Sequence, residues 1–505
     1  MANLVYDVHD KPKFGKMLIF ALQQLLAILA ATIAVPTIIG LPTQIPAAIF
    51  GAGVGTIVYQ LFTKFKSPVF LGSSFAFLSS LGAALAYGYC GIVLGSIVAG
   101  LVYVIIAIVI HFAGTKWVSK LMPPVIIGPT VALIGLSLAG SAMGDIVAAN
   151  ATKVHGSYNL VSLFCGVVTF ATVIICSVQK RFTMPKLIPF IIGIVAGYVV
   201  ASLFTLVGTL CDIDYFMIVD WSPLVNNFVD KDGVFKGFTA FINVPKFSIV
   251  EAIKELATKG FSPEILEATK GNASLLNGGG IVEVIIAFLP VALVVFAEHI
   301  ADHKNLSTII DKDLITEPGL KRTLLGDGVG SIAGTLFGVC PNTTYGESVG
   351  CVAITGNASV ITITTTAIMC IVLSFIGPVM ALLQTIPKCV MGGVCLTLYG
   401  FIAVSGLKMF KEVDLNDNKN LFIVSAILIA GIGGLSIQIP YSNQIKAVLD
   451  ITIENLAIVD SAIIEQGFAK VITITPIATA LILGILTNVV LTAIEKSKLG
   501  KKKGE

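Results

Sequence analysis

Charged residues are scarce in this sequence. They make up only 12% of its 505 residues, whereas 56% of the residues are hydrophobic. Soluble domains carry about twice that share of charge. The composition therefore excludes an ordinary soluble multi-domain protein and indicates an integral membrane protein. Hydrophobic stretches of roughly 17 to 25 residues recur along the chain, which favours helical spans over the weakly alternating strands of a membrane barrel.

Motifs for catalysis and for cofactor binding are also lacking. The sequence has no P-loop, no nucleophile elbow and no cluster with metal-ligand spacing. Its nine cysteines are scattered and never form a CxxC pair, so we interpret them as small core residues. We therefore expect no enzyme, no metal, no cofactor and no nucleic-acid partner. A charged tail without a cleavage site precedes the first hydrophobic segment, so we expect no removed signal peptide.

Charge clusters and proline or glycine residues divide the chain into about 14 predicted spans in the lipid bilayer of the cell (inner or plasma) membrane. The spans are 16–36, 45–63, 68–86, 91–113, 121–143, 160–178, 187–209, 281–302, 319–338, 339–356, 358–385, 389–409, 419–438 and 470–494. Most of the 32 Lys and Arg residues fall in alternate loops. By the positive-inside rule, both termini are then cytoplasmic and the 210–280 loop is extracellular.

The 210–280 loop is the only sizeable segment outside the predicted spans. We expect a helix over 249–258, from its periodicity, and a glycine-rich linker over 271–280. We interpret the loop as a tolerated surface insertion, because insertions of this kind are commoner than regulatory elements.

A faint internal repeat relates the two halves of the chain. Pro123 precedes Gly128 by five residues in the fifth span, and Pro387 precedes Gly392 by five residues in the twelfth. Polar, extended stretches also interrupt one span in each half, the third and the tenth. Seven spans is an odd number, so two such halves have opposite orientations in the membrane, which is typical of secondary transporters.

The predicted fold class is therefore an all-α polytopic membrane protein with two inverted seven-span repeats. The first repeat covers 1–209, the extracellular loop 210–280, and the second repeat 281–505. Short extended segments are expected in spans 3 and 10, where irregular backbone is tolerated only if protein or a water-lined cavity satisfies its N–H and C=O groups. We interpret the two interrupted spans as two parts of one binding site.

Few ionisable residues lie inside the predicted spans, and each is a functional candidate because burying a charge in a membrane is costly. The main ones are Glu298 in span eight and Glu347 in span ten, with Asp302 and His303 one turn after Glu298. Carboxyl groups in a low-dielectric cavity can bind and release protons. His299 and His303 are each as compatible with a position at the cytoplasmic end, beside Lys304, as with a functional role. For Asp327 in span nine, helix packing is the favoured interpretation.

Hydrogen-bond donors are expected where each interrupted span turns into a half-helix. The first N–H groups of a helix lack intrahelical partners and carry the positive end of its dipole. At Phe75 and at Gly346 and Glu347 they would point toward carbonyl oxygens of a substrate, while the carboxylates accept its N–H groups. A planar ring with alternating C=O and N–H groups, flanked by Phe75 and Tyr345, fits these partners. Another neutral polar metabolite remains an alternative.

Four stretches carry a family resemblance that extends over about residues 11–495. They are Leu22-Gln-Gln-Leu-Leu-Ala-Ile-Leu-Ala-Ala-Thr32, Phe70-Leu-Gly-Ser-Ser-Phe-Ala-Phe77, Ala297-Glu-His-Ile-Ala-Asp-His-Lys304 and Pro341-Asn-Thr-Thr-Tyr-Gly-Glu347. Ile386-Pro-Lys-Cys-Val-Met-Gly-Gly393 matches as well. In these stretches the chain resembles the bacterial uracil permeases of the nucleobase/ascorbate transporter family.

The resemblance implies a 14-span inverted fold, usually dimeric, with a core domain (spans 1–4 and 8–11) and a gate domain (spans 5–7 and 12–14). It also implies a site between the two interrupted spans. By the matched motifs, that site comprises Glu298, Glu347, Phe75 and Gly346, with Ala31 and Tyr345 lining the substrate ring. The implied function is proton-driven import of uracil, with Glu298, Glu347, Asp302 and His303 as candidates for proton coupling.

Three positions depart from the family pattern. Gln24 replaces a histidine of span one, Ser348 replaces a preferred asparagine after Glu347, and Asp302 stands where some uracil permeases have a histidine. Uracil and xanthine or another purine therefore remain alternative substrates, and proton and sodium remain alternative coupling ions. An anion transporter on the same scaffold, resembling the sulfate permeases, is a weaker alternative because Glu298 and Glu347 are acidic.

Overall fold

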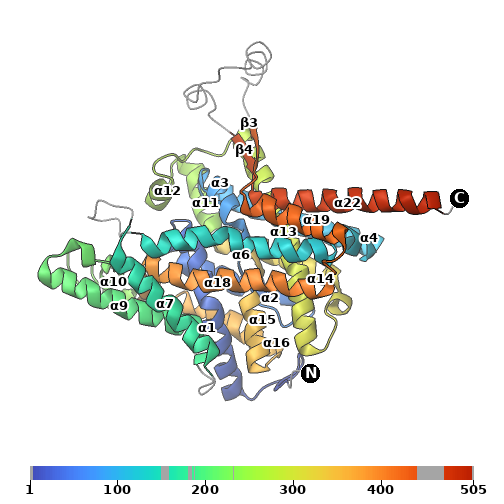
Figure 1. Cartoon of the computed structure of the whole chain (residues 1–505). Coiled ribbons are helices and arrows are strands. Elements are labelled where there is room, and N and C mark those ends of the chain that lie inside the picture. Colours follow the sequence, from blue (N-terminus) through green and yellow to red (C-terminus); the bar gives the residue numbers. More distant parts are fainter. Residues whose placement is uncertain are drawn as a thin grey trace, which may run out of the picture.

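The structure is a computed structural model that describes residues 4–148, 158–179, 185–186, 188–230, 232–440 and 471–502 (Figure 1). The described chain is predominantly helical. Its longer helices are α1 (Phe14–Ile38), α2 (Ile45–Phe62), α4 (Gly88–Ala113), α6 (Pro124–Val147), α7 (Leu160–Val178), α9 (Pro189–Cys211), α13 (Gly278–Ile310), α14 (Leu320–Phe337), α16 (Val360–Leu373), α18 (Lys388–Lys408), α19 (Asn418–Ile432) and α22 (Pro476–Lys502). Shorter helices are α3 (Leu78–Leu85), α5 (Lys116–Leu121), α10 (Ser222–Phe228), α11 (Ser248–Thr258), α12 (Pro263–Ala268), α15 (Gly346–Thr355) and α17 (Gly377–Gln384).

Nine of the described helices are long and apolar enough to cross a membrane. They are α1, α2, α4, α6, α7, α9, α13, α18 and α22. Each coincides with one of the predicted spans within a few residues at its start. Residue 187, which begins the seventh predicted span, and residue 470, which begins the last, lie outside the described residues.

The eleventh predicted span, 358–385, is two helices rather than one. The helix α16 ends at Leu373, and α17 begins at Gly377 with Pro378 in its first turn. Proline lacks an N–H group and disfavours helical backbone in the residue before it, so the helix cannot continue through this point. The chain bends here.

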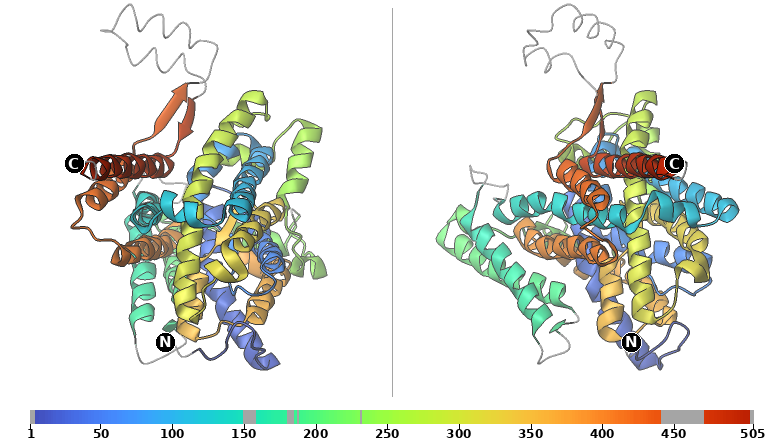
Figure 2. Two further views of the ribbon diagram at one scale, coloured as in Figure 1. Left: turned by 90° about the vertical axis from the view of Figure 1, so that its right-hand side faces the viewer. Right: turned by 45° about the vertical axis from the view of Figure 1, so that its right-hand side comes forward.

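Strands occur at four of the predicted spans and not only at spans 3 and 10. The expected extended segments are β1 (Leu71–Ser73) and β2 (Asn342–Thr344). In addition, β3 (Ile437–Pro440) and β4 (Val471–Ile474) form an antiparallel pair that projects from the helical body (Figure 2). These segments are rich in β-branched residues, which favour strands over helices. Hydrophobicity alone extended the thirteenth and fourteenth predicted spans over them.

Helices approach one another most closely where glycine residues lie between them. A Cβ atom on Gly100 would lie 2.5 Å from the carbonyl oxygen of Gly328, where α4 crosses α14. On the other face of α14, a Cβ atom on Gly330 would lie 2.7 Å from the carbonyl oxygen of Gly55 in α2. The glycines thus let α14 pack directly between α2 and α4. The three helices form a rigid support behind β1 and β2.

The 210–280 insertion is fixed to the helical body rather than free. Its helix α11 confirms the helix predicted at 249–258, and the backbone N–H of Cys90, in the first turn of α4, donates to Glu255 of α11 at 3.2 Å. A Cβ atom on Gly88, whose φ is +63°, would lie 2.5 Å from the same carboxyl group. The side chain of Ser248 donates to the carbonyl oxygen of Gly338. The insertion therefore packs against the ends of α4 and α14.

The contact of Glu255 with α4 predicts a pH dependence. Burial raises the pKa of the Glu255 carboxyl group above its ordinary value of 4.5. The stabilising effect of protonation is therefore complete below that ordinary value and is lost as the pH rises through the raised pKa. We expect the midpoint of thermal unfolding to increase as the pH falls from neutral toward 4.5, and Glu255→Gln to remove this part of the dependence. Glu267 is exposed, so the control variant Glu267→Gln should keep the same pH dependence of the unfolding midpoint.

Candidate functional site

The two interrupted spans pair with each other through their strands. Strand β1 is antiparallel to β2, and Gly72 lies opposite Thr343 in the centre of the pair. The backbone N–H of Ser74 donates to the carbonyl oxygen of Pro341 at 3.0 Å, which extends the ladder by one bond. The backbone polar groups of both segments thus satisfy each other inside the helical body, as irregular backbone in a membrane protein requires.

A half-helix follows each strand and begins at the residue that the sequence predicts. After β1, a 3-10 turn from Phe75 to Phe77 leads into α3. After β2, α15 begins at Gly346 and has Glu347 in its first turn. A Cβ atom placed on Gly346 would find only one atom within 4 Å, the Oδ1 atom of Asp302 at 3.9 Å. The start of α15 therefore faces open space, next to a carboxyl group.

Carboxyl groups of α13 face this start of α15. The hydroxyl of Thr344 in β2 donates to Oδ2 of Asp302 at 2.6 Å, and Asp302 is buried. Glu298 is four residues earlier on the same helix face. Its Oε2 atom is buried and has no hydrogen-bond partner among the described residues. Glu347 is in the first turn of α15, and α15 packs against α13. Glu298 and Glu347 are both half-buried.

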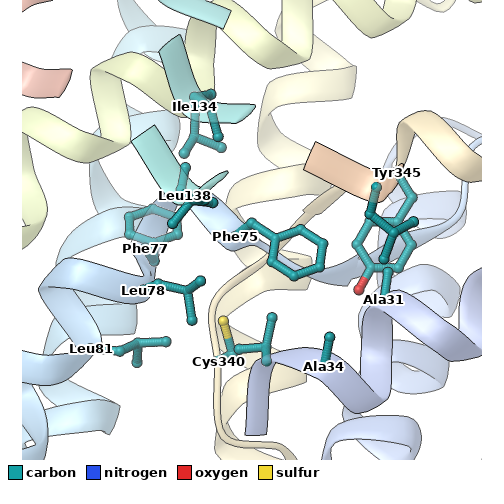
Figure 3. Packing of buried hydrophobic residues seen from close by; sticks show 14 of the residues in the cluster. Ala31, Ala34, Phe75, Phe77, Leu78, Leu81, Ile134, Leu138, Cys340 and Tyr345 are labelled. Atoms are coloured by element: carbon teal, nitrogen blue, oxygen red, sulfur yellow. The ribbon is translucent and has the colours of Figure 1, made fainter. Parts of the chain in front are cut away.

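The aromatic residues of the site lie deeper than the carboxyl groups. Figure 3 shows the Phe75 ring between Leu138 on one side and Tyr345 with Ala31 on the other. Phe75 is buried and meets the ring of Tyr399, from α18, edge to face at 5.2 Å between centroids. This contact connects the segment that follows β1 to α18. Tyr399 is a neighbour of the site that sequence reasoning missed, because it lies in an ordinary apolar span.

Tyr345 packs inward against the strand pair. Its hydroxyl donates to the carbonyl oxygen of Ser73 at 3.0 Å and lies 3.4 Å from Oγ1 of Thr32 in α1. A Cβ atom on Gly72 would lie 2.2 Å from the Tyr345 ring, so the glycine makes room for it. Tyr345 is 3% exposed and Ala31 is fully buried. The tyrosine thus holds β1, β2 and α1 together.

The two histidines of α13 point away from Glu298 and Asp302. His299 pairs with Asp327 of α14, with Nδ1 and Oδ2 2.6 Å apart, and both are buried. His303 donates from Nδ1 to the carbonyl oxygen of His299, and its Nε2 lies 2.8 Å from the hydroxyl of Tyr59 in α2. Neither histidine lies at an exposed cytoplasmic end. His299 and Asp327 connect α13 to α14, which agrees with the packing role predicted for Asp327.

The buried pair predicts a large loss of stability. Asp327→Ala leaves Nδ1 of His299 without its partner in a buried site, while Nε2 keeps its contact with Thr323, and an unsatisfied buried polar group costs about 1 to 3 kcal/mol. The pair of Lys66 and Glu317, with Glu317 72% exposed, contributes little to stability because solvent screens its charges. Thermal unfolding in detergent should therefore show a clearly lower midpoint for Asp327→Ala and little change for Glu317→Ala. Equal shifts for the two variants would contradict the structural role of the pair.

A comparison with known protein families identifies the chain. A family model described as a permease family (Xan_ur_permease) matches residues 15–228 and 272–439. The chain belongs to this family. The unmatched segment between the two ranges falls within the 210–280 insertion. The permease is a multi-pass membrane protein, as its apolar helices and its relatives agree.

Curated relatives cover nearly the whole length of the permease. A uracil permease of Bacillus caldolyticus is 38% identical over 448 residues, which are 88% of this chain and 91% of that one. A uracil permease of Bacillus subtilis (strain 168) is 37% identical and covers 86% and 89% of the two chains. One of Escherichia coli (strain K12) is 32% identical and covers 87% and 90%. These relatives are named as transporters and not as enzymes.

Solved structures resemble the permease in fold alone. The transmembrane domain of a cyanobacterium bicarbonate transporter, BicA, matches with a TM-score of 0.50 at 15% identity, over 84% of this chain and 96% of that one. SLC26A9 matches with a TM-score of 0.58 at 9% identity, over 95% of this chain and 65% of that one. Identities this low carry no inference about the substrate. The matches show that the helical body shares its fold with these two structures.

Two departures from the family pattern meet in the structure. The side-chain amide of Gln24 in α1 donates to the hydroxyl of Ser348 at 2.5 Å, and both residues are buried. Ser348 directly follows Glu347, so this bond fixes the first turn of α15 against α1. In the sequence, the two departures are 324 residues apart. In the sequence, the only feature that Gln24 and Ser348 share is that each is a polar residue within an apolar segment.

Proposed function

We propose that the permease imports a nucleobase, uracil, by coupling its uptake to the entry of protons. The observation that supports this most directly is the buried Oε2 atom of Glu298, which has no partner among the described residues and lies one helical turn before Asp302, the residue next to the open start of α15. A buried acceptor without a partner is costly, so such an atom points to a ligand that donates to it. The three uracil permeases described above support uracil as that ligand.

In the proposed complex, the uracil ring lies between the interrupted spans. Glu298 accepts from the ring N–H groups, and Glu347 completes the pocket from the opposite half. The backbone at Phe75 and Gly346 donates to the ring carbonyl oxygens, because both residues begin half-helices. Tyr345 and Ala31 form the wall behind the ring. The small exposed area of Tyr345 assigns it the role of holding this wall rather than of binding polar atoms.

Proton coupling is assigned to the acidic groups around the same space. Glu298 and Glu347 carry it together with Asp302, whose carboxyl group lies beside Gly346 and bonds Thr344 of β2. Protonation of Asp302 would change a bond to the strand that supports the site. His303 contributes from the next turn of α13, through its contact with Tyr59.

We further propose that the permease has 14 spans in two inverted repeats. The glycines of the sequence repeat support this arrangement. A Cβ atom on Gly128, near the start of α6, would lie 3.1 Å from the carbonyl oxygen of Gly406, near the end of α18. A Cβ atom on Gly392, near the start of α18, would lie 2.9 Å from the carbonyl oxygen of Ala142, near the end of α6. The two helices thus cross antiparallel through equivalent residues.

The core domain would comprise spans 1–4 and 8–11, and the gate domain spans 5–7 and 12–14. Every charged residue of the proposed site lies on a core element, whereas Tyr399 contacts Phe75 from a gate element. This division supports alternating access by elevator-like motion, in which the core carries the substrate past the gate. Both termini would be cytoplasmic, the 210–280 insertion extracellular, and the working unit a homodimer in the cell membrane.

Two other transport functions are candidates. A xanthine or other purine permease of the same family differs in the size of the ring that the site holds. An anion transporter requires a fixed cation at its site. No Lys or Arg is buried in the part of the chain that the structure describes, and the groups at the open start of α15 are acidic. Charge therefore favours a neutral nucleobase over an anion.

Ligand-induced stabilisation tests the substrate. The purified permease is heated with uracil, thymine, xanthine, hypoxanthine, bicarbonate or sulfate at increasing concentrations. A ligand that binds the folded state alone raises the unfolding midpoint by mass action, by about 2.7 kcal/mol at 100 times its Kd. We expect a shift with uracil and none with bicarbonate or sulfate. A shift with xanthine alone would replace uracil by a purine, and a shift with an anion alone would contradict the proposal.

A further inference from the structure

The 210–280 insertion contains a short segment, 234–244, with an unusual surface. Six of its eleven residues expose large apolar side chains. They are Val234 (60% exposed), Phe235 (59%), Phe238 (78%), Phe241 (51%), Ile242 (52%) and Val244 (72%). The only charged residue within the segment is Lys236, whose Nζ atom donates to the carbonyl oxygen of Asn226. Loops in water rarely gather so much apolar surface, because each exposed ring is unfavourable there.

The segment is held in a defined shape. Phe228 stacks on Phe235 with 6.5 Å between ring centroids, and Phe241 meets both Phe228 and Phe238 within 6.4 Å. The amide side chain of Asn227 donates to the carbonyl oxygen of Ala240 at 2.8 Å. The exposed rings are therefore presented by a built surface and do not result from an unfolded loop.

Hydrogen bonds attach this surface to the end of α16. The backbone N–H of Asn243 donates to the carbonyl oxygen of Phe375 at 2.8 Å. The side-chain amide of Asn243 donates to the carbonyl oxygen of Ser374, also at 2.8 Å. Ile242 forms an antiparallel bridge with Ile376. The segment thus lies directly beyond the last turn of α16, at the bend between α16 and α17.

The flank of α16 that leads to the segment is also exposed and apolar. Ile368 is 50% exposed, Val372 57%, Phe375 38% and Ile376 40%. With 14 residues, α16 is not one of the nine helices long enough to cross a membrane, but an exposed apolar helix flank in a multi-pass membrane protein still faces lipid. The apolar surface of the segment continues this flank without a charged residue between them. The segment therefore lies where the hydrocarbon layer ends.

We propose that residues 234–244 insert into the lipid–water interface of the bilayer beside α16. Aromatic side chains favour this region, where the ring is in an apolar environment and the backbone still reaches water. The hydration of the interface satisfies backbone groups that the hydrocarbon layer would leave unpaired. The insertion is then an interfacial anchor for the end of α16, and only its remaining parts face water. This inference is independent of the identity of the substrate.

Depth-dependent fluorescence quenching tests the anchor. Trp117 and Trp221 are replaced by Phe, and a single reporter is introduced as Phe238→Trp or, at the other end of the segment, Val244→Trp. Each variant is reconstituted into phosphatidylcholine vesicles that carry bromine near the head group or deep in the acyl chains. We expect strong quenching by the shallow bromines, weaker quenching by the deep ones, and little quenching by acrylamide. Elution as a single species confirms that each variant is folded.

A control on the same insertion separates lipid from water. Glu267 in α12 is exposed and charged, so the reporter Glu267→Trp should be quenched by acrylamide and not by brominated lipid. If Trp at 238 and 244 behaved like Trp at 267, the segment would face water and the proposal would be wrong. If neither quencher reached them, the segment would be covered by a second copy of the chain, which would also overturn it.

Discussion

Glu298→Gln is expected to abolish concentrative uptake of uracil. The substitution keeps the size of the side chain and removes its charge, so a buried acceptor toward the substrate becomes in part a donor. Losing a charge-assisted hydrogen bond costs about 2 to 4 kcal/mol, which corresponds to roughly a 30- to 700-fold weaker Kd. In the proposed mechanism, the proton that this carboxylate would carry is lost as well. Both changes act on the same transport cycle, so the combined effect should be the largest of any conservative change in the permease.

Proteoliposomes with an imposed pH gradient provide the measurement. Uptake of labelled uracil is compared between Glu298→Gln and Glu283→Gln, a carboxyl group near the start of the same helix that accepts a hydrogen bond from Tyr87. The control should retain uptake within about twofold of the unmodified permease, since an amide oxygen still accepts this bond. A sodium gradient without a pH gradient distinguishes the two coupling ions. Gradient-driven uptake that survives in Glu298→Gln would refute the proposed role.

Gly346→Ala is expected to abolish transport while leaving the fold intact. The added methyl group would meet only Oδ1 of Asp302, at 3.9 Å, so the protein has room for it. In the proposed complex, the same methyl group would stand where the substrate ring approaches the backbone N–H groups of α15. Binding by close approach is steeply sensitive to such a displacement. The unfolding midpoint should therefore match that of the unmodified permease, while its shift with uracil disappears.

Gly72→Ala is the matched control for that prediction, with the opposite outcome. A Cβ atom on Gly72 would lie 2.2 Å from the ring of Tyr345, which is bonded to Ser73 and buried. Overpacking at such a position costs about 1 to 3 kcal/mol. The unfolding midpoint of Gly72→Ala should fall. Retained uracil uptake in Gly346→Ala would show that the space in front of Gly346 is not the binding site.

The His299–Asp327 pair separates structural from functional buried charge in this permease. Both residues lie in apolar helices, as Glu298 and Asp302 do, and composition alone treats all four alike. The structure divides them by their partners. His299 and Asp327 satisfy each other at 2.6 Å, whereas Oε2 of Glu298 is left without a partner in the described chain. Removing one partner of a buried polar pair destabilises the fold, whereas a buried polar atom that the protein leaves unpaired is available to a ligand.

The sequence by itself determined the membrane environment, the positions of the main helices and the two interrupted segments. These features depend on local properties: a run of apolar residues, a proline, or a glycine beside polar residues acts over a few neighbours along the chain. The sequence also pointed to Glu298 and Glu347, because an ionisable residue in an apolar helix is conspicuous in any fold. It failed at 437–440 and 471–474, where hydrophobicity does not distinguish a strand from a helix.

Only the tertiary structure decided which of these residues meet. Thr344 bonds Asp302, Gln24 bonds Ser348, and the ring of Tyr345 turns onto Gly72. The tertiary structure likewise placed segment 234–244 at the end of α16, whereas the sequence indicated a plain surface loop. Such contacts join residues that are far apart in the chain, and they depend on how whole helices pack. Packing is fixed by the shapes and polar groups of many side chains together, which no local pattern contains.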